Sequence, residues 1–319
     1  MKIKEFTIIL SFILFIQVLY SQKRNGKIEY VRNKDKSVTF FYNSILPNST
    51  FIILKFNNLT NTNTTIVKKT VKGFRSQITT LRPIDSEKSI RFSYSYRTFL
   101  GNIDKEPDSN FKYILPIKKG NNIKVKYLSY LGKKFGNKEP ENWKSFQFLT
   151  SLNDTVYAIR KGIVVKVINK YNNDESKEFG YHSKSNSITI EHKDGTLATY
   201  KVLKRNSIMV KVGDLVYPSA PIAIAGTYDK AKNSQLRLSI YYLNKKVKDL
   251  PYEYFSKTTV GNRIHIHSYV DPFFYTNSGG IIQIERNKEY ASNYDDTIIE
   301  LEMTKRERKR WKKKGLLIK

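Results

Sequence analysis

Histidine is the residue type that most directly limits the chemistry of this chain. The 319 residues include four histidines and no cysteine, and these two types are the usual zinc ligands besides carboxylates. His265 and His267 alternate, so on a β-strand both rings would project to one face, where a metal ion could bind them. The alternative is a pair of surface or partly buried imidazoles. His182, in a polar loop, and His192, at an Asp-Gly turn, are expected to be ordinary surface residues.

Positive charge is the second chemical feature. Lys and Arg number 57 against 28 Asp and Glu, giving a net charge of +29, which favours polyanionic partners without identifying one. Near the C-terminus, Thr304 to Glu307 has the form of a capping box that opens a basic helix. An anionic lipid surface, an envelope polymer or nucleic acid could bind this segment, and a solvated tail is the alternative. Its candidate contact residues are Lys305, Arg306, Arg308, Lys309, Arg310, Lys312, Lys313 and Lys314.

The elements that must position any site are short strands with tight turns. Residues 153–167 alternate a turn, a strand, a Gly turn and a β-branched strand, and residues 187–200 run through Asp-Gly, a strong hairpin signal. Residues 208–216 and 220–226 add further short strands. The pattern predicts an antiparallel β domain.

The segments IEHKDGTLATY (190–200), VKVGDLV (210–216) and APIAIAG (220–226), which follow VYAI at 156–159, occur in the order found in a known family. Over about a hundred residues the chain resembles the lysostaphin/LytM-type zinc endopeptidases, which cleave peptide cross-links in bacterial cell walls. The resemblance implies that family's antiparallel β core, the duplicated hybrid motif.

The resemblance also implies where the zinc site would lie. In that family an early His-x-x-x-Asp supplies two ligands, a late His-x-His supplies the third ligand and a catalytic His, and another His follows the Tyr of a Y-x-H-L motif. Three protein ligands leave one position open for the water that attacks the substrate. In this chain Trp143, Gln147 and Arg237 stand at the ligand positions, and Val202 and Gln235 stand at the catalytic positions.

None of these five side chains suits a catalytic zinc site. Arg237 is the most telling, because a guanidinium stays charged and only donates hydrogen bonds. We therefore expect no cofactor and a groove that binds rather than cleaves, lined by Trp143, Gln147, Tyr200, Tyr228, Gln235 and Arg237. Zinc is expected only under the alternative, in which His265 and His267 form a relocated site.

The N-terminal segment predicts export. A basic start precedes an apolar run from Phe6 to Tyr20, and Ser21 offers a small residue for cleavage. The run is short for a membrane span, although a retained anchor is the alternative. The predicted organisation is a signal peptide at 1–21, a β-sandwich-like domain at 22–131, a linker at 132–142, the peptidase-like domain at 143–260, a β extension at 261–303 and a basic helix or tail at 304–319.

The sequence thus predicts a mainly β, exported pseudopeptidase that is periplasmic or secreted and acts as a binding or regulatory module at the cell envelope. The resemblance implies peptidoglycan or an envelope protein such as a wall hydrolase as partner, because degenerate LytM-like proteins in other bacteria activate wall amidases. Anionic envelope polymers or lipid are further candidates, and export disfavours nucleic acid. The alternatives are an active zinc endopeptidase on peptidoglycan cross-links and a basic surface-binding module.

Overall fold

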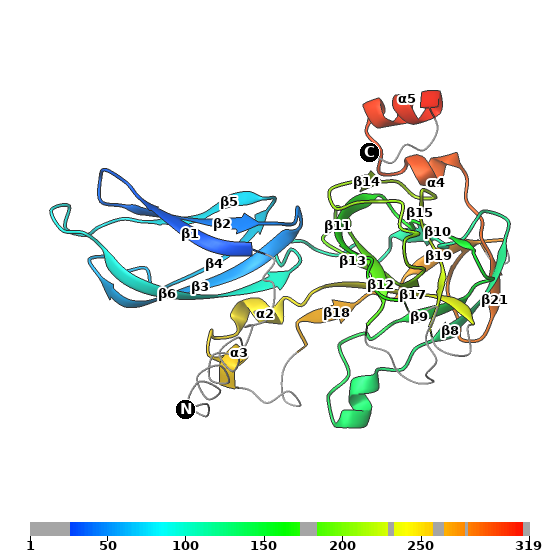
Figure 1. The fold of residues 1–319 in the computed structure, drawn as a ribbon, viewed down its shortest axis with the longest axis horizontal. Helices are drawn as coiled ribbons and strands as arrows, with labels where there is room; N and C mark the ends of the chain where they lie inside the picture. Colours follow the sequence, from blue (N-terminus) through cyan, green and yellow to red (C-terminus); the bar gives the residue numbers. More distant parts are fainter. Residues whose placement is uncertain (1–25, 173–183, 229–232, 258–264, 278–279, 315–319) are drawn as a thin grey trace, which may run out of the picture.

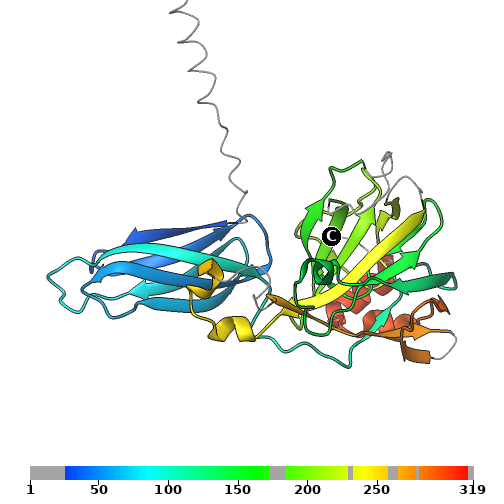
Figure 2. The ribbon, with the colours of Figure 1, turned by 90° about the horizontal axis from the view of Figure 1, so that it is seen from below.

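A computed structural model describes residues 26–172, 184–228, 233–257, 265–277 and 280–314. These residues form two β-rich units that lie side by side (Figures 1 and 2). The predicted signal peptide, His182 and the end of the basic tail lie outside the described residues. Within the described ranges, no helix is long and apolar enough to cross a membrane.

The first unit is a sandwich of two antiparallel sheets, which confirms the predicted β-sandwich-like fold. One sheet has the order β1-β2-β5 and the other β4-β3-β6. Alternating residues of β2 are buried, as expected for a strand with one face on the core. Phe40 and Tyr42 of the first sheet pack there against Ile52 and Leu54 of the second. The strands are β1 Gly26–Arg32, β2 Val38–Ser44, β3 Ser49–Thr60, β4 Ile66–Lys72, β5 Arg75–Leu81 and β6 Arg91–Leu100.

Strand β3 is apolar on both faces because it belongs to two cores. Ile52 and Leu54 face the sandwich, whereas Phe51 and Ile53 face a smaller cluster that includes Leu243 of the second unit. Helices α2 (Lys246–Asp249) and α3 (Tyr254–Lys257) lie beside the sandwich at this junction (Figure 2). The two units therefore share buried apolar surface.

The second unit is built on a large, mainly antiparallel sheet. Its path is β14-β11-β12-β13-β17-β9-β8-β21, and β16 and β18 also pair with β17. The Asp-Gly hairpin expected near residue 195 connects β12 and β13. The strands are β8 Asn122–Tyr127, β9 Phe146–Leu149, β11 Gly162–Ile168, β12 Asn186–Glu191, β13 Leu197–Leu203, β14 Leu215–Val216, β16 Gly226–Thr227, β17 Ser234–Leu243, β18 His267–Tyr269 and β21 Glu289–Ala291.

Two smaller sheets complete this unit. Strands β10 (Thr155–Tyr157) and β15 (Pro221–Ile224) form an antiparallel pair. Strand β19 (Phe273–Thr276) pairs with β20 (Gly280–Gln283) and, in parallel, with β7 (Lys112–Ile114). Because β7 and β8 pair with strands of the second unit, the strand pairing divides the chain before residue 112, whereas the sequence analysis divides it at residue 131.

Short helices occupy the loops and the C-terminal part of the second unit. The 3-10 helix η1 (Leu131–Phe135) lies between β8 and β9 in the sequence. Helix α4 (Asp296–Glu300) begins after Asp295, whose side chain accepts a hydrogen bond from Ile298 N. Helix α5 (Lys305–Lys314) is the predicted C-terminal helix, and Figure 1 shows it beside β14 and α4.

Candidate functional site

The strand register brings three of the predicted site residues together. Arg237 on β17 lies directly opposite Gln147 on β9, and Gln235, two residues earlier on β17, points to the same face. On the other side of β17, Arg237 lies opposite Lys201 of β13. The early and late motifs thus meet on one sheet face, as the resemblance implies.

Gln147, Gln235 and Arg237 form a connected polar group. Gln147 Nε2 donates to Gln235 Oε1 at 2.9 Å, and Arg237 Nε donates to the same oxygen at 3.0 Å. The Arg237 guanidinium stacks on Tyr228, with Cζ 3.6 Å from the ring centroid. Both the ring and the amide oxygen thus fix the orientation of the guanidinium.

A groove of about 800 Å³ opens above this group, and we call it the M-groove. Trp143, Val202, Tyr228 and Arg237 from the predicted set line it, together with Lys201. Gln147 and Gln235 do not line it. Gln235 accepts the hydrogen bond of Arg237, and Gln147 is joined to the group through Gln235. The M-groove therefore lies at the predicted metal position.

Val202 lies in the M-groove in a strained backbone conformation. Its φ is 65°, in the left-handed region that β-branched residues avoid. Its side chain is buried. Position 202, which is predicted to have lost a histidine, thus holds an apolar side chain. The surrounding packing must offset the backbone strain of Val202.

Tyr200 does not lie in the M-groove, so its predicted binding role is not supported by its position. Its side chain is 0% exposed within the main core, and its hydroxyl accepts a hydrogen bond from Ile159 N at 2.9 Å. Side chains alternate along β13, so Tyr200 points to the face opposite Lys201.

Aromatic rings form one wall of the M-groove, a feature that the sequence analysis missed apart from Trp143. The Trp143 ring meets Tyr130 edge-on at 5.0 Å and Tyr269 at 4.6 Å between ring centroids. Its indole N–H donates to Leu128 O at 2.9 Å. Tyr241 continues the wall at 5.9 Å from Tyr269. These residues come from β17, β18 and the segment between β8 and β9, so no local motif could have grouped them.

The residues at the metal position do not fit zinc. An indole N–H and a guanidinium only donate hydrogen bonds, and the Gln235 amide oxygen already accepts two. Within the described ranges, no group of three or more His, Cys, Asp and Glu side chains is placed to hold a metal ion. No hydrolytic step can therefore be derived through a metal held by these residues.

His265 and His267 each donate a hydrogen bond to a backbone carbonyl. His265 Nε2 donates to Lys138 O, and His267 Nε2 donates to Leu100 O at 3.1 Å. Both line a second hollow of about 620 Å³, and His267 also lines the M-groove. Burial lowers the pKa of His267, so its ring is neutral at pH 7. Each ring keeps only Nδ1 for another partner.

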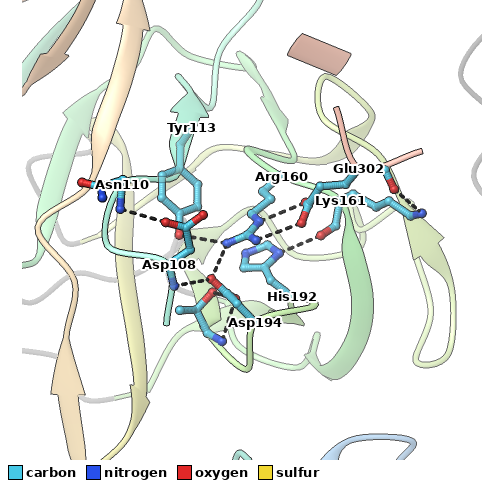
Figure 3. A network of polar contacts seen from close by, with 9 residues as sticks. Asp108, Asn110, Tyr113, Arg160, Lys161, His192, Asp194 and Glu302 are labelled. Carbon is cyan, nitrogen blue, oxygen red and sulfur yellow. Dashed lines mark hydrogen bonds and ion pairs between the residues drawn. The ribbon is translucent and has the colours of Figure 1, made fainter. Parts of the chain in front are cut away.

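A second polar cluster, not anticipated from the sequence, surrounds Arg160. Its Nε and one terminal nitrogen donate to the two carboxylate oxygens of Glu302 at 3.0 and 2.9 Å, and the other terminal nitrogen donates to Asp194 at 2.7 Å. Figure 3 shows Arg160 between these two carboxylates. Its guanidinium also stacks on Phe111, with Cζ 3.5 Å from the ring centroid. Burial acts to raise the pKa of Asp194, but the Arg160 charge keeps it below its ordinary value.

His192 belongs to this cluster, so the expectation that it is a surface residue is wrong. It is 3% exposed, and Nδ1 lies 2.9 Å from Lys161 O, which can only accept, so Nδ1 carries the proton. Nε2 is buried and has no hydrogen-bond partner among the residues that the structure describes. Burial and the nearby Arg160 charge lower its pKa to about 3. His192 is therefore neutral at pH 7.

The Arg160 cluster and Lys161 anchor the C-terminal segment. Lys161 Nζ bonds to Glu307 at 2.8 Å, and Tyr217 donates to the same carboxylate at 2.8 Å. The expected capping box is present, with Thr304 N donating to Glu307 and Glu307 N donating to Thr304 Oγ1. Trp311 packs against the main core. Helix α5 is thus docked on the second unit.

Comparison with known families gives one match, which lies in the second unit. Residues 141–249 match the profile of Peptidase family M23. The chain therefore contains a domain that matches peptidase family M23. This range includes all five positions at which the sequence analysis placed lost zinc ligands or catalytic residues.

Solved structures of peptidases are similar to the chain at low identity. The catalytic domain of lysostaphin from Staphylococcus simulans is 20% identical, with 39% of this chain and 79% of that chain covered and a TM-score of 0.25. A zinc-containing peptidase from Vibrio cholerae is 14% identical, with 67% and 82% covered and a TM-score of 0.26. No curated protein matches the chain.

Proposed function

We propose that the M23 domain of this chain is a binding or regulatory module that does not hydrolyse peptide bonds. One observation carries the proposal: at the predicted metal position, Gln147 and Arg237 both donate hydrogen bonds to the amide oxygen of Gln235. Arg237 adds a fixed positive charge there, and a unit charge about 4 Å from another costs about 4 kcal/mol at an effective dielectric of roughly 20. A dication is disfavoured further.

We further propose that the protein acts outside the cytoplasm, at the bacterial cell envelope. The basic start and the apolar run to Tyr20 support export. Peptidoglycan or an envelope protein such as a wall hydrolase is the proposed partner of the M-groove. The docked helix α5 offers a second contact, to an anionic envelope polymer or lipid surface, because Arg306 and Lys309 are exposed on it.

Metal content and wall digestion test the proposal. The purified protein, incubated with zinc and then desalted, is expected to retain less than stoichiometric metal and to release no peptides from peptidoglycan, whereas a zinc-dependent member of the same family digests the wall in the same assay. Stoichiometric zinc together with chelator-sensitive digestion would overturn the proposal.

The same samples test the alternative enzyme. His265 and His267 line one hollow, so a relocated zinc would have to use their Nδ1 atoms. Under that alternative, His265→Ala and His267→Ala each abolish both the bound zinc and the digestion. Under the proposed function, neither substitution changes the metal content.

A further inference from the structure

Positively charged side chains lie in a row across the sheet face of the M-groove. One cross-strand row contains, in order, Lys201 on β13, Arg237 on β17, Gln147 on β9 and Lys126 on β8. Lys166 on β11 lies in the next row, opposite Thr189, which in turn lies opposite Thr199. Four cations therefore extend across one sheet face. Lys201 and Arg237 line the M-groove, and Lys126 and Lys166 lie beyond its lining on the same face.

These cations have no anionic partner in the part of the chain that the structure describes. The ion pairs found there involve none of Lys126, Lys166, Lys201 and Arg237. Glu191, on the same face of β12, already accepts a hydrogen bond from Ser49 N at 2.8 Å. Like charges directly opposite each other destabilise a sheet. Partial desolvation and the charges of Arg237 and Lys166 lower the pKa of Lys201, as expected for repulsion that nothing relieves.

The contacts of Arg237 restrict how an anion can approach it. Nε is committed to Gln235, and Tyr228 covers one face of the guanidinium. Only the edge with the two terminal nitrogens remains, and this edge matches the two oxygens of one carboxylate. Lys201, directly opposite on β13, can contact the same anion or an adjacent one.

The spacing of the row fits an extended peptide that lies across the strands. Neighbouring strands are about 4.8 Å apart, so the three steps from Lys201 to Lys126 span roughly 14 Å. Every second side chain of an extended peptide points the same way, at intervals of roughly 6.7 Å. Three alternate acidic side chains therefore span about 13 Å and match the row. The aromatic wall with Trp143 and Tyr269 provides contact surface for the remaining side chains.

We propose that the M-groove binds an acidic peptide segment in extended conformation, with one side-chain carboxylate held end-on by Arg237 and others held by Lys201 and Lys126. This inference rests on the proposed function, because a metal at the same position would occupy the place of the carboxylate. A flat lipid surface could not enter a groove with these walls.

The two tryptophans of the chain allow a site-specific test. Trp143 lines the M-groove and Trp311 lies on α5, so Trp311→Phe leaves an emission signal from the M-groove alone. A capped hexaglutamate peptide is expected to change this emission saturably, whereas capped hexaglutamine leaves it unchanged. We expect Arg237→Gln to weaken hexaglutamate binding at least about tenfold, as for a lost charge-assisted hydrogen bond. We expect Lys201→Gln to weaken it about threefold, as for a lost exposed ion pair.

Matched measurements decide between the outcomes. Lys309→Gln, on the exposed face of α5, removes one charge outside the M-groove and is expected to leave hexaglutamate binding unchanged. Thermal unfolding of each variant shows that the fold is retained, and Lys201→Gln alters only an exposed side chain. Wild-type affinity in both M-groove variants would overturn the inference. The inference would also be overturned if hexaglutamate changed the emission of Trp311 in a Trp143→Phe protein but not the emission of Trp143 in the Trp311→Phe protein. Binding of inorganic polyphosphate with the same affinity as hexaglutamate would overturn it as well.

The test separates this inference from the proposed function. Zinc content and wall digestion are measured on the same preparations. A metal-free, inactive protein that does not bind hexaglutamate would overturn only the acidic-peptide inference. A zinc-loaded, wall-digesting protein would overturn the proposed function itself.

Discussion

Gln147 donates a 2.9 Å hydrogen bond to Gln235 across the β9–β17 pair, at the metal position predicted from the sequence. The bond joins the early and late motifs directly, as a shared zinc ion would join them through ligands. Arg237 donates to the same oxygen. This side-chain link adds to the backbone pairing of β9 and β17.

Restoring the ligands is therefore expected to restore zinc binding. In the triple variant Trp143→His, Gln147→Asp and Arg237→His, the donor set becomes two imidazoles and a carboxylate, as in catalytic zinc sites. Removing one positive charge about 4 Å from the ion is worth about 4 kcal/mol or more at an effective dielectric of roughly 20. We expect zinc affinity, measured by competition with a chromogenic chelator, to rise at least about 100-fold.

The double variant Trp143→His and Gln147→Asp is the matched control, because it gains two ligands and keeps Arg237. It is expected to bind zinc no better than the wild type. Equal zinc binding by the double and triple variants would show that the guanidinium does not exclude the metal. Without a histidine at Val202 or Gln235, the triple variant is expected to bind zinc without digesting the cell wall.

Much of the second unit could be predicted from the sequence, because its turns and motifs are formed by residues that lie close together in the sequence. The Asp-Gly turn specifies the β12–β13 hairpin, where Gly195 has a φ of 85°. The order of the motifs alone predicts that Gln147, Gln235 and Arg237 share one site, and the β9–β17 register brings them together. The capping box at Thr304 and Glu307 is equally local, since both partners lie within one helical turn.

The remaining features depend on contacts between distant residues, which a single sequence does not specify. The Arg160 cluster joins side chains that are 142 positions apart, and a buried charge looks like a surface charge in a sequence. The inward orientation of Tyr200 depends on which face of β13 meets the core. The burial of His192 could not be predicted for the same reason, because the residues that cover its hairpin are distant in the sequence.

Removal of the Arg160 guanidinium is expected to destabilise the protein strongly. In Arg160→Ala, the largely buried carboxylates of Asp194 and Glu302 lose their common cationic partner. Breaking such a buried pair typically costs about 3–5 kcal/mol. Urea unfolding at pH 7 measures the loss. Lys88→Ala, which removes an exposed ion pair with Asp85, is the control and is expected to leave the midpoint unchanged. The same midpoint for both variants would contradict the prediction.

The buried His192 is expected to make stability depend on pH. Its folded pKa is about 3, against 6.5 for the free side chain, so between these values the unfolded chain binds more protons. Stability is therefore full above pH 6.5 and falls as the pH is lowered towards 3, by up to about 1.4 kcal/mol per pH unit. Urea unfolding at pH 7, 6 and 5 measures this slope.

His192→Asn provides the control for that slope, since its amide can donate to Lys161 O but does not titrate. We expect the variant to be less stable at pH 7, because the smaller side chain leaves a cavity, and to lose the pH dependence between 7 and 5. An unchanged slope in His192→Asn would assign the proton uptake to other groups.

Docking of helix α5 is expected to fail at acidic pH because it depends on the ionised Glu307. Burial acts against ionisation, but hydrogen bonds from Lys161, Thr304 and Tyr217 lower the pKa of Glu307 to about 2, from 4.5. A carboxylate with a depressed pKa stabilises the folded state fully above pH 4.5, and this contribution is lost as the pH falls towards 2. In a Trp143→Phe background, Trp311 emission is expected to shift towards that of exposed indole over this range.

Glu307→Gln separates this local release from general acid unfolding. The variant loses the charge that Lys161 contacts, so its Trp311 emission at pH 7 is expected to resemble that of the parent protein at low pH. Far-UV circular dichroism, recorded in parallel, reports the sheets. Two results together would contradict the prediction: the sheet signal and the Trp311 emission of the parent change at the same pH, and Glu307→Gln at pH 7 has the Trp311 emission of the parent. The contacts of Trp311 with the core would then hold α5 without Glu307.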